Sequence, residues 1–404
     1  MNIILVHKYF WPDTPPYATI LFSIAKKLAA DGHNVNIYSS LPGYKSTANQ
    51  TQSPKTEVID GVKITRIKIL SEYDGSKLKK LFNLIYFPVR VLAHVVRHRQ
   101  TTDLVMCSTV PPVLIGICCA TAARISNAKF IYHCMDIYPE IGKLSGEFKN
   151  KLIYRVLLYL DQKTCNIAST VVVLSSDMKQ SLINRRSPTG KIRILNNFPI
   201  ADSENDEPET DIKILLKKPG TFRILFAGNI GRFQNLEKYV QAMKHFRSDD
   251  KVELVFLGEG AKLTELINLT AQLKLDNVRF IPHQTVSVAR RVMEDADLGI
   301  VSLSENVYKY AFPSKTMTYL ELGCKILMTV EKNSELAQML EEHNLGYLAD
   351  PTSTDSIGTA IRSAMAEAKS SNSMHCKNHV EANYSEEKML KKWSALVSGM
   401  EHNK

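Results

Sequence analysis

The chain has 404 residues, and its contents of 44% hydrophobic and 23% charged residues are typical of a soluble globular protein, not of a disordered one. A single hydrophobic core rarely extends over such a length, so we expect two or three domains. The net charge of +10 is compatible with nucleic acid, anionic lipid or a phosphorylated ligand as a partner. The sequence has no nucleic-acid-binding motif, and its aromatic residues do not interleave with basic ones, so we expect no nucleic-acid partner.

The N-terminal residues predict a strand and not the basic leader of a signal peptide. The longest apolar stretch, Val110–Ile125, contains prolines and a glycine and is too short to span a bilayer. Seven cysteines are scattered without the spacing of a disulfide framework or of a zinc site. This pattern predicts a protein of the reducing cytoplasm without a metal.

Strands alternate with helices through the first half of the chain, which predicts a mainly parallel sheet. Strands are predicted at 2–6, 35–38, 104–107, 129–133, 171–174 and 191–195, a helix at 17–30 and a hairpin at 58–69. Trp11 and Asp13 follow the first strand, at the carboxyl edge where such sheets bind ligands. An aromatic loop there can stack on a sugar or a base, or it can fill the space between the loop and the next helix.

His133 and Asp136 lie at the end of another predicted strand and therefore at the same edge of the sheet. A histidine and a carboxylate at this edge are candidates for acting on a substrate. The alternative is that His133 is a hydrogen-bonded core residue and that Asp136 caps the following helix.

The segment Lys77–Arg99 combines an apolar stripe at helical spacing with dense positive charge. The stripe consists of Leu78, Leu81, Phe82, Ile85 and Val89, and the basic residues include Lys77, Lys79, Lys80 and Arg90. This pattern predicts either an amphipathic helix that rests on an anionic membrane surface or a core helix with a solvated basic face.

The acidic stretch 201–210 predicts a linker, and a second series of strands and helices begins at Phe222. Gly228 and Gly231 allow a turn after its first strand to approach a phosphate, and Arg232 adds charge. Pro313–Lys315 begins a helix after a later strand, and its backbone donors, hydroxyl and ammonium can converge on an anion. Together the two turns predict a clamp for a diphosphate, although each can also be an ordinary connection.

The order of these motifs resembles the family-4-type retaining glycosyltransferases of bacterial O-antigen, capsule and exopolysaccharide biosynthesis. The motifs are YFWPD at 9–13, DIYPE at 136–140, FAGNIG at 226–231, LGEG at 257–260 and PSKxxxYLxxG at 313–323. The resemblance covers nearly the whole chain and implies an α/β, GT-B fold of two Rossmann-like domains facing across a cleft. We expect the domains at 1–199 and 221–384, a linker at 200–220, and a helix at 385–404 that crosses back to the first domain.

The resemblance implies transfer of a hexosyl or N-acetylhexosaminyl group, with retention, from a nucleotide diphosphate sugar. The implied acceptor is a glycan on a polyprenyl-diphosphate lipid, reached from the cytoplasmic face of the inner membrane, where the protein would be peripheral. We expect UDP rather than GDP as the nucleotide. No metal or further cofactor is implied, because lysine and arginine supply the positive charge.

The resemblance also implies roles for single residues. Gly231, Arg232, Ser314 and Lys315 would contact the diphosphate, His283 and Thr318 the base or ribose, His133 and Asp136 the reacting sugar, and Trp11 and Asp13 the acceptor or sugar side. Many relatives carry two glutamates eight positions apart where this chain has Tyr310 and Thr318, so the binding of ribose stays open. The alternatives are a sugar-nucleotide 2-epimerase and a non-catalytic nucleotide-sugar-binding partner in a polysaccharide assembly complex.

Overall fold

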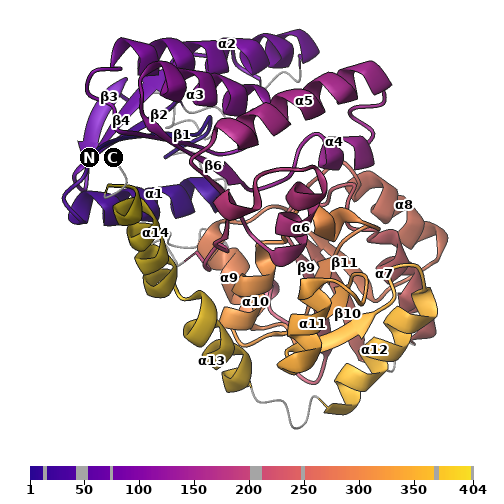
Figure 1. Cartoon of the computed structure of the whole chain (residues 1–404). Helices are drawn as coiled ribbons and strands as arrows, with labels where there is room; N and C mark the ends of the chain where they lie inside the picture. The colour runs from indigo at the N-terminus through magenta and orange to yellow at the C-terminus, as the bar shows by residue number, and fades with distance from the viewer. Residues whose placement is uncertain are drawn as a thin grey trace. The chain divides into compact units, whose positions relative to one another are not determined.

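The chain folds into two compact units in the computed structural model (Figure 1). The structure describes residues 1–11, 16–41, 53–72, 76–200, 212–246, 251–367 and 373–401. The first unit comprises Met1–Asn197, Tyr310–Phe312 and the C-terminal segment from Glu386, and the second comprises Phe198–Lys309 and Pro313–Ser385. The predicted linker falls largely outside the described residues.

The first unit contains an eight-stranded sheet in the order β3-β4-β2-β1-β5-β6-β7-β8. Its strands are β1 (Asn2–Val6), β2 (Asn34–Ser40), β3 (Thr56–Ile59), β4 (Val62–Ile67), β5 (Leu104–Cys107), β6 (Lys129–Cys134), β7 (Thr170–Val173) and β8 (Ile192–Ile194). Every neighbouring pair is parallel except β3 and β4, which form the predicted hairpin. The central strands β5 and β7 are buried along their whole length, which explains their continuous apolar sequences.

Helices cover this sheet on both faces. They are α1 (Pro16–Ala30), α2 (Lys77–Arg97), α3 (Leu114–Ile125), α4 (Glu140–Leu144), α5 (Lys151–Ile167), α6 (Ser176–Asn184) and α14 (Glu386–Glu401). Helices α2, α3 and α5 lie side by side, and the C-terminal helix α14 packs against α1 in the first unit (Figure 1).

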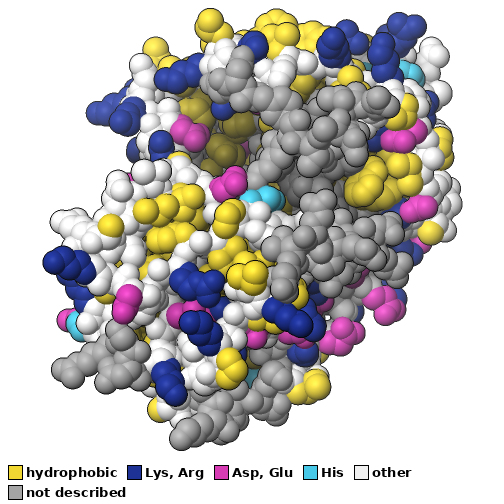
Figure 2. Space-filling view, turned by 180° about the vertical axis from the view of Figure 1, so that it is seen from behind, with side chains coloured by type: hydrophobic (Ala, Val, Ile, Leu, Met, Phe, Trp, Pro, Cys, Tyr) yellow, Lys and Arg dark blue, Asp and Glu magenta, His cyan; other side chains and the backbone are white. Residues whose placement is uncertain are grey.

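Helix α2 turns its predicted apolar stripe outward. The residues that it buries against the unit are Asn83, Phe87, Pro88, Val91 and Val95. The exposed fractions of the stripe are 79% for Leu78, 55% for Leu81, 48% for Phe82, 54% for Ile85 and 52% for Val89. Figure 2 shows hydrophobic side chains among Lys and Arg side chains at the top of the view, where Figure 1 places α2. The alternative of a core helix with a solvated basic face therefore holds in part, because α2 buries other apolar residues and exposes the predicted stripe beside its basic residues.

Among the described residues, no helix is both long enough and apolar enough to cross a membrane.

The second unit contains a six-stranded sheet in the order β11-β10-β9-β12-β13-β14, with every pair parallel. Its strands are β9 (Phe222–Ala227), β10 (Val252–Leu257), β11 (Val278–Ile281), β12 (Leu298–Ser302), β13 (Lys325–Thr329) and β14 (Gly346–Ala349). Its helices are α7 (Glu237–Ala242), α8 (Leu263–Gln272), α9 (Val286–Glu294), α10 (Lys315–Glu321), α11 (Glu335–Glu342), α12 (Thr354–Glu367) and α13 (Ser373–Tyr384). This is the Rossmann strand order, in which β10 and β11 lie on one side of β9 and the later strands, from β12 on, lie on the other side. Such an order places a ligand crevice at the carboxyl ends of β9 and β12.

Candidate active site

The side chain of Lys315 lies at the switch point of the second sheet, beside β9, where the order of the strands reverses. Its Nζ atom is 3.6 Å from the centre of the Phe226 ring on β9. Removal of the ammonium from water lowers the pKa of Lys315 to about 7. No carboxylate of the described residues forms an ion pair with it. The site therefore holds a desolvated cation whose charge the rest of the described chain does not neutralise.

Helix α10 begins at Lys315 and not, as expected, at Pro313. Ser314 is the N-cap residue, and its hydroxyl makes no capping bond to the helix. The proline lies before the cap because the Thr316 N–H donates to the Pro313 carbonyl, 3.0 Å away, as the chain turns into the helix. The predicted convergence of the backbone donors, the Ser314 hydroxyl and the Lys315 ammonium on an anion stays a prediction.

The glycine turn after β9 lies next to this ammonium. Gly228 has a φ of +127°, and a side-chain carbon placed on it would lie 3.3 Å from Lys315 Nζ. A glycine therefore keeps the space beside the ammonium open. The Gly228 N–H donates to the Leu257 carbonyl, and the Gly231 N–H donates to Gln234 Oε1, each at a distance of 2.9 Å. The N–H groups of these two glycines are thus engaged within the protein, and the predicted approach of the turn to a phosphate stays a prediction.

Two further glycines hold this turn in place, and sequence reasoning set them aside. A side-chain carbon on Gly258 would lie 2.1 Å from the Gly228 carbonyl oxygen, and one on Gly260 would lie 2.2 Å from the Ile230 carbonyl oxygen. The loop after β10 can pack this closely only without side chains. The sequence named these glycines only as part of the LGEG motif at 257–260.

Tyr319 fixes α10 against the sheet, and the sequence named it only as part of a motif. Its hydroxyl accepts a hydrogen bond from the Ala227 N–H at 2.9 Å and donates one to the Leu225 carbonyl at 2.8 Å. A side-chain carbon on Gly299 of β12 would lie 2.4 Å from the Tyr319 ring. Tyr319 follows Lys315 by one helical turn, so its anchorage to β9 and β12 sets the direction of the Lys315 side chain.

The other predicted donor residues lie at the same edge of the second sheet. Ser314 and Arg232 are exposed, Thr318 is half-buried on α10, and His283 is exposed directly after β11. Their placement is compatible with the predicted contacts, and their roles at the diphosphate, base or ribose stay predictions.

Glu321 does not replace the glutamates that relatives carry at positions 310 and 318. Its Oε2 accepts a hydrogen bond from the Arg290 guanidinium of α9 at 2.9 Å, so the carboxylate is engaged in an ion pair. A displaced glutamate on α10 therefore does not explain how this chain holds a ribose.

His133 lies in the core of the first unit. Its side chain is 1% exposed, its Nδ1 is 2.9 Å from the Tyr17 hydroxyl, and its ring meets that of Trp393 edge-to-face at 5.0 Å. Burial lowers the pKa of His133 to about 3, so the ring is neutral near pH 7. This environment favours the packing role that the sequence left open, and the implied contact of His133 with the reacting sugar stays a prediction.

Asp136 follows β6 at the carboxyl edge of the first sheet. Helix α4 begins at Glu140 with Pro139 as its N-cap residue, so the expectation that Asp136 caps a helix is wrong. Burial raises the pKa of Asp136 to about 6. Its backbone pairs with Ala311, and the Ile137 N–H donates to the Tyr310 carbonyl at 2.7 Å. The position at which relatives carry a glutamate thus lies beside this carboxylate.

The aromatic loop after β1 divides its side chains between core and surface. Phe10 is fully buried and contacts Phe22, whereas Trp11 is 48% exposed and its carbonyl accepts a hydrogen bond from Arg66 at 2.7 Å. Asp13 lies outside the described residues. Phe10 therefore fills the space between the loop and the helix, whereas the stacking of Trp11 on a sugar or a base stays a prediction.

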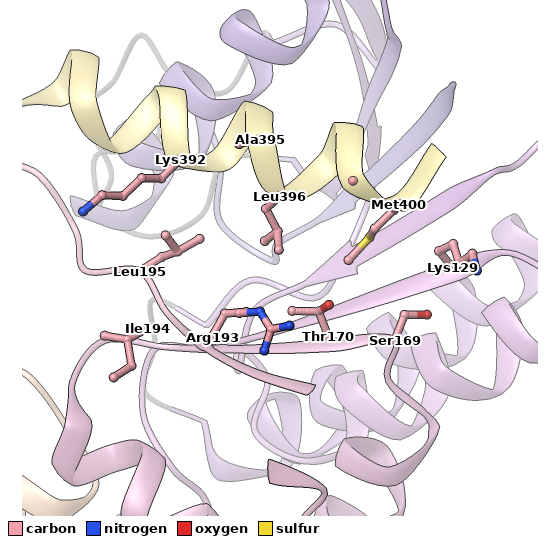
Figure 3. A pocket seen from close by; sticks show the side chains of 11 residues that line it. Lys129, Ser169, Thr170, Arg193, Ile194, Leu195, Lys392, Ala395, Leu396 and Met400 are labelled. Atoms are coloured by element: carbon pink, nitrogen blue, oxygen red, sulfur yellow. The ribbon is translucent and has the colours of Figure 1, made fainter. Parts of the chain in front are cut away.

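A cavity of about 620 Å³ lies in the first unit between α14 and the strands β7 and β8 (Figure 3). Its described lining combines the cations Lys129, Arg193 and Lys392 with the apolar Leu195, Leu396 and Met400, among others. None of the predicted site residues is among those that line it. The cavity therefore gives no support to the donor or sugar assignments.

Comparisons with known proteins identify both halves of the chain. Residues 17–197 match the family model described as a glycosyl transferase 4-like domain, and residues 207–379 match the model described as glycosyl transferases group 1. The chain is 21% identical over 380 residues to WcaI of Escherichia coli, covering 90% of this chain and 92% of that protein. WcaI is named as a colanic acid biosynthesis glycosyl transferase.

Solved structures of glycosyltransferases superpose on the whole chain. Sucrose-phosphate synthase from Thermosynechococcus elongatus gives a TM-score of 0.77 at 16% identity and covers 100% of both chains. HepE of Anabaena in complex with UDP-glucose gives a TM-score of 0.68 at 15% identity and covers 99% of this chain and 100% of that one. At such identities the likeness shows the fold, which is the expected GT-B fold with two parallel-sheet Rossmann-like domains. Because two successive glycosyltransferase models match most of its length, the chain is a glycosyltransferase with a 4-like domain followed by a group 1 domain.

Proposed function

We propose that this glycosyltransferase moves a hexosyl or N-acetylhexosaminyl group, with retention, from a nucleotide diphosphate sugar to a polyprenyl-diphosphate-linked glycan in bacterial surface polysaccharide synthesis. The observation that carries the proposal is the buried ammonium of Lys315. A desolvated cation without a counter-charge is unfavourable, and an incoming diphosphate supplies that charge.

The Lys315 ammonium acts where negative charge develops. As the bond between the sugar carbon and the diphosphate oxygen breaks, charge grows on the leaving oxygen, and a preformed cation in a water-poor site stabilises it. The new bond forms from the acceptor hydroxyl, whose proton passes to the leaving phosphate, so the protein chiefly positions the reactants. Asp136, with its raised pKa, stands on the sugar side in this proposal.

The choice of donor and acceptor rests on the relatives. HepE binds UDP-glucose in its solved structure, which supports UDP as the nucleotide here. The name of WcaI refers to colanic acid, a polysaccharide, which supports a glycan acceptor. These relatives and the motif order favour sugar transfer over the epimerase and the non-catalytic binding partner.

Helix α2 supports a peripheral position on the cytoplasmic face of the inner membrane. Its outward stripe, which includes Phe82, is flanked by Lys77, Lys79, Lys80 and Arg90. Such a helix lies in the plane of an anionic membrane surface with its apolar side chains inserted. A lipid-linked acceptor is reached at that surface.

Ligand-induced stabilisation tests the donor site. We expect UDP and UDP-sugars at about one hundred times their dissociation constants to add roughly 2.7 kcal/mol of stability, measured as a thermal shift. A shift with GDP ligands alone would overturn the choice of nucleotide, and no shift with either would overturn the donor site. Product analysis then distinguishes the activities, because an epimerase converts the donor without acceptor, and a non-catalytic partner binds donor without turnover.

Donor binding should also take up a proton above neutral pH. In the unliganded protein Lys315 has a pKa of about 7, so it is mostly neutral at pH 8. A bound diphosphate favours the charged form, so calorimetric titration with UDP-glucose in buffers of different ionisation enthalpy should show proton uptake at pH 8 and little at pH 6. Equal uptake at both pH values, or uptake that persists in Lys315→Met, contradicts this assignment.

The lowered pKa of Lys315 also determines how the stability of the unliganded protein changes with pH. The unfolded lysine keeps its proton between about pH 7 and its ordinary pKa of 10.5, whereas the folded one has lost it. Because the unfolded state then binds more protons, the Lys315 contribution to stability rises with pH across this window.

A further inference from the structure

Helix α5 presents a second apolar and basic surface, which the sequence did not single out. Four large hydrophobic side chains on it are exposed: Leu152 at 70%, Ile153 at 52%, Val156 at 50% and Tyr159 at 56%. Lys151, Arg155 and Lys163 are exposed on the same helix. Scattered single hydrophobic residues are normal at a protein surface, but four within three turns of one helix form a patch.

Helix α3 joins this patch to the stripe on α2. It packs against α2 on one side and against α5 on the other (Figure 1). Its half-buried residues between them include the apolar Leu114, Ile117 and Cys118. The outward faces of the three helices, called here the α2–α3–α5 surface, therefore form one continuous layer.

This surface carries no exposed carboxylate. The only acidic residue within the three helices is Asp161, which is 2% exposed. Its oxygens accept hydrogen bonds from the Tyr132 hydroxyl at 2.8 Å and from Arg185 at 2.6 Å. The basic residues of the three helices are Lys77, Lys79, Lys80, Arg90, Arg97, Arg124, Lys151, Arg155 and Lys163. The charge of the layer is thus positive throughout.

We infer that the α2–α3–α5 surface as a whole docks on an anionic lipid bilayer, with α5 as a second contact helix. The inference rests on the proposed function, in which the acceptor is a lipid. Protein–protein interfaces are depleted of lysine at their cores, whereas here lysines alternate with exposed aliphatic residues. Lysine stems can extend along inserted hydrophobic side chains while their ammonium groups reach the lipid phosphates.

With α5 as a second contact helix, docking fixes the orientation of the first unit and not only its attachment to the bilayer. Helix α2 has 21 residues and α5 has 17, so they extend about 31 and 25 Å. Contact along α2 alone would leave the unit able to rotate about that helix. Contact along both helices defines a plane and fixes the orientation of the first unit relative to the leaflet.

Vesicle sedimentation of the full chain tests this surface, with phosphatidylcholine vesicles that contain or lack phosphatidylglycerol. We expect Val156→Glu to weaken binding to the anionic vesicles about tenfold, because an inserted side chain is lost and a repelled charge is added. Ile267→Glu is the matched control, since Ile267 is an exposed helical residue of α8 in the second unit. The double variant Lys151→Glu/Arg155→Glu tests the same helix through exposed positions.

The outcomes separate this inference from the proposed function. If both α5 variants bind like the parent while Leu81→Glu on α2 does not, α5 is not a contact helix and the inference is overturned. Equal binding of the parent to neutral and anionic vesicles also overturns it. Self-association that Val156→Glu abolishes would instead identify a second copy as the occupant. The UDP-induced thermal shift should be the same in all these variants, so its loss in the parent protein would refute the donor site alone.

Discussion

Lys315→Met is expected to lower kcat by about a hundredfold or more, because it removes the cation that stabilises the leaving diphosphate. The unliganded protein should become no less stable. The Lys315 ammonium is desolvated against Phe226 without a carboxylate partner among the described residues. A methionine at this position fills similar space without a buried charge. Activity should therefore fall without a loss of stability. Initial rates of sugar transfer and thermal unfolding without ligand measure the two effects.

Lys309→Met is the matched control for this substitution. Lys309 lies in the same connection between β12 and α10, and its ammonium donates to Asn306 Oδ1 at 2.7 Å. It should leave both transfer and the UDP-induced shift near the parental values. Full activity in Lys315→Met would remove Lys315 from the donor site, and a loss of activity in both variants would point to the connection as a whole.

The mainly parallel sheet of the first unit could be predicted from the sequence because short apolar runs alternate with helical segments and turns. Strands β1 and β5 have the predicted bounds, since each is a buried run ended by a polar residue. The direction in which α2 faces could not be predicted. Periodicity identified one apolar stripe, but the helix has a second apolar set, Phe87, Val91 and Val95, and this second set is the one that is buried. Asn83 is buried with it, and its amide bonds the Leu70 backbone and Glu72. A polar residue as an anchor carries no hydrophobic signal.

Site residues that depend on distant partners escaped prediction for a related reason. The hydroxyl of Tyr319 bonds Ala227, which is 92 residues away in sequence. His133 was correctly placed at the end of a strand, but the Trp393 ring of α14 covers it. Local spacing predicts where an element ends, whereas only the packed fold shows what lies on top of it. Lys315 was found because its motif is local.

The second large effect is expected at Arg185, whose guanidinium joins three segments of the first unit. It donates to Asp161 of α5 at 2.6 Å, to the Tyr138 carbonyl at 2.9 Å and to Glu140 of α4 at 2.5 Å. The side chains of Arg185 and Asp161 are 7% and 2% exposed. Burial raises the pKa of Asp161 to about 7, although the Tyr132 hydroxyl, which donates to it, lowers the pKa in part.

Arg185→Met should destabilise the protein by roughly 3–5 kcal/mol, because it leaves two carboxylates without their buried partner. At about 2–4 °C per kcal/mol for a unit of this size, the unfolding temperature should fall by roughly 6–20 °C in a calorimetric scan. Arg186→Met, at the exposed neighbouring position, is the control and should shift it little. If both variants unfold together, the arginine network is not a source of stability. Since Tyr138 and Glu140 follow Asp136 closely, a folded Arg185→Met protein should also transfer sugar more slowly than the control.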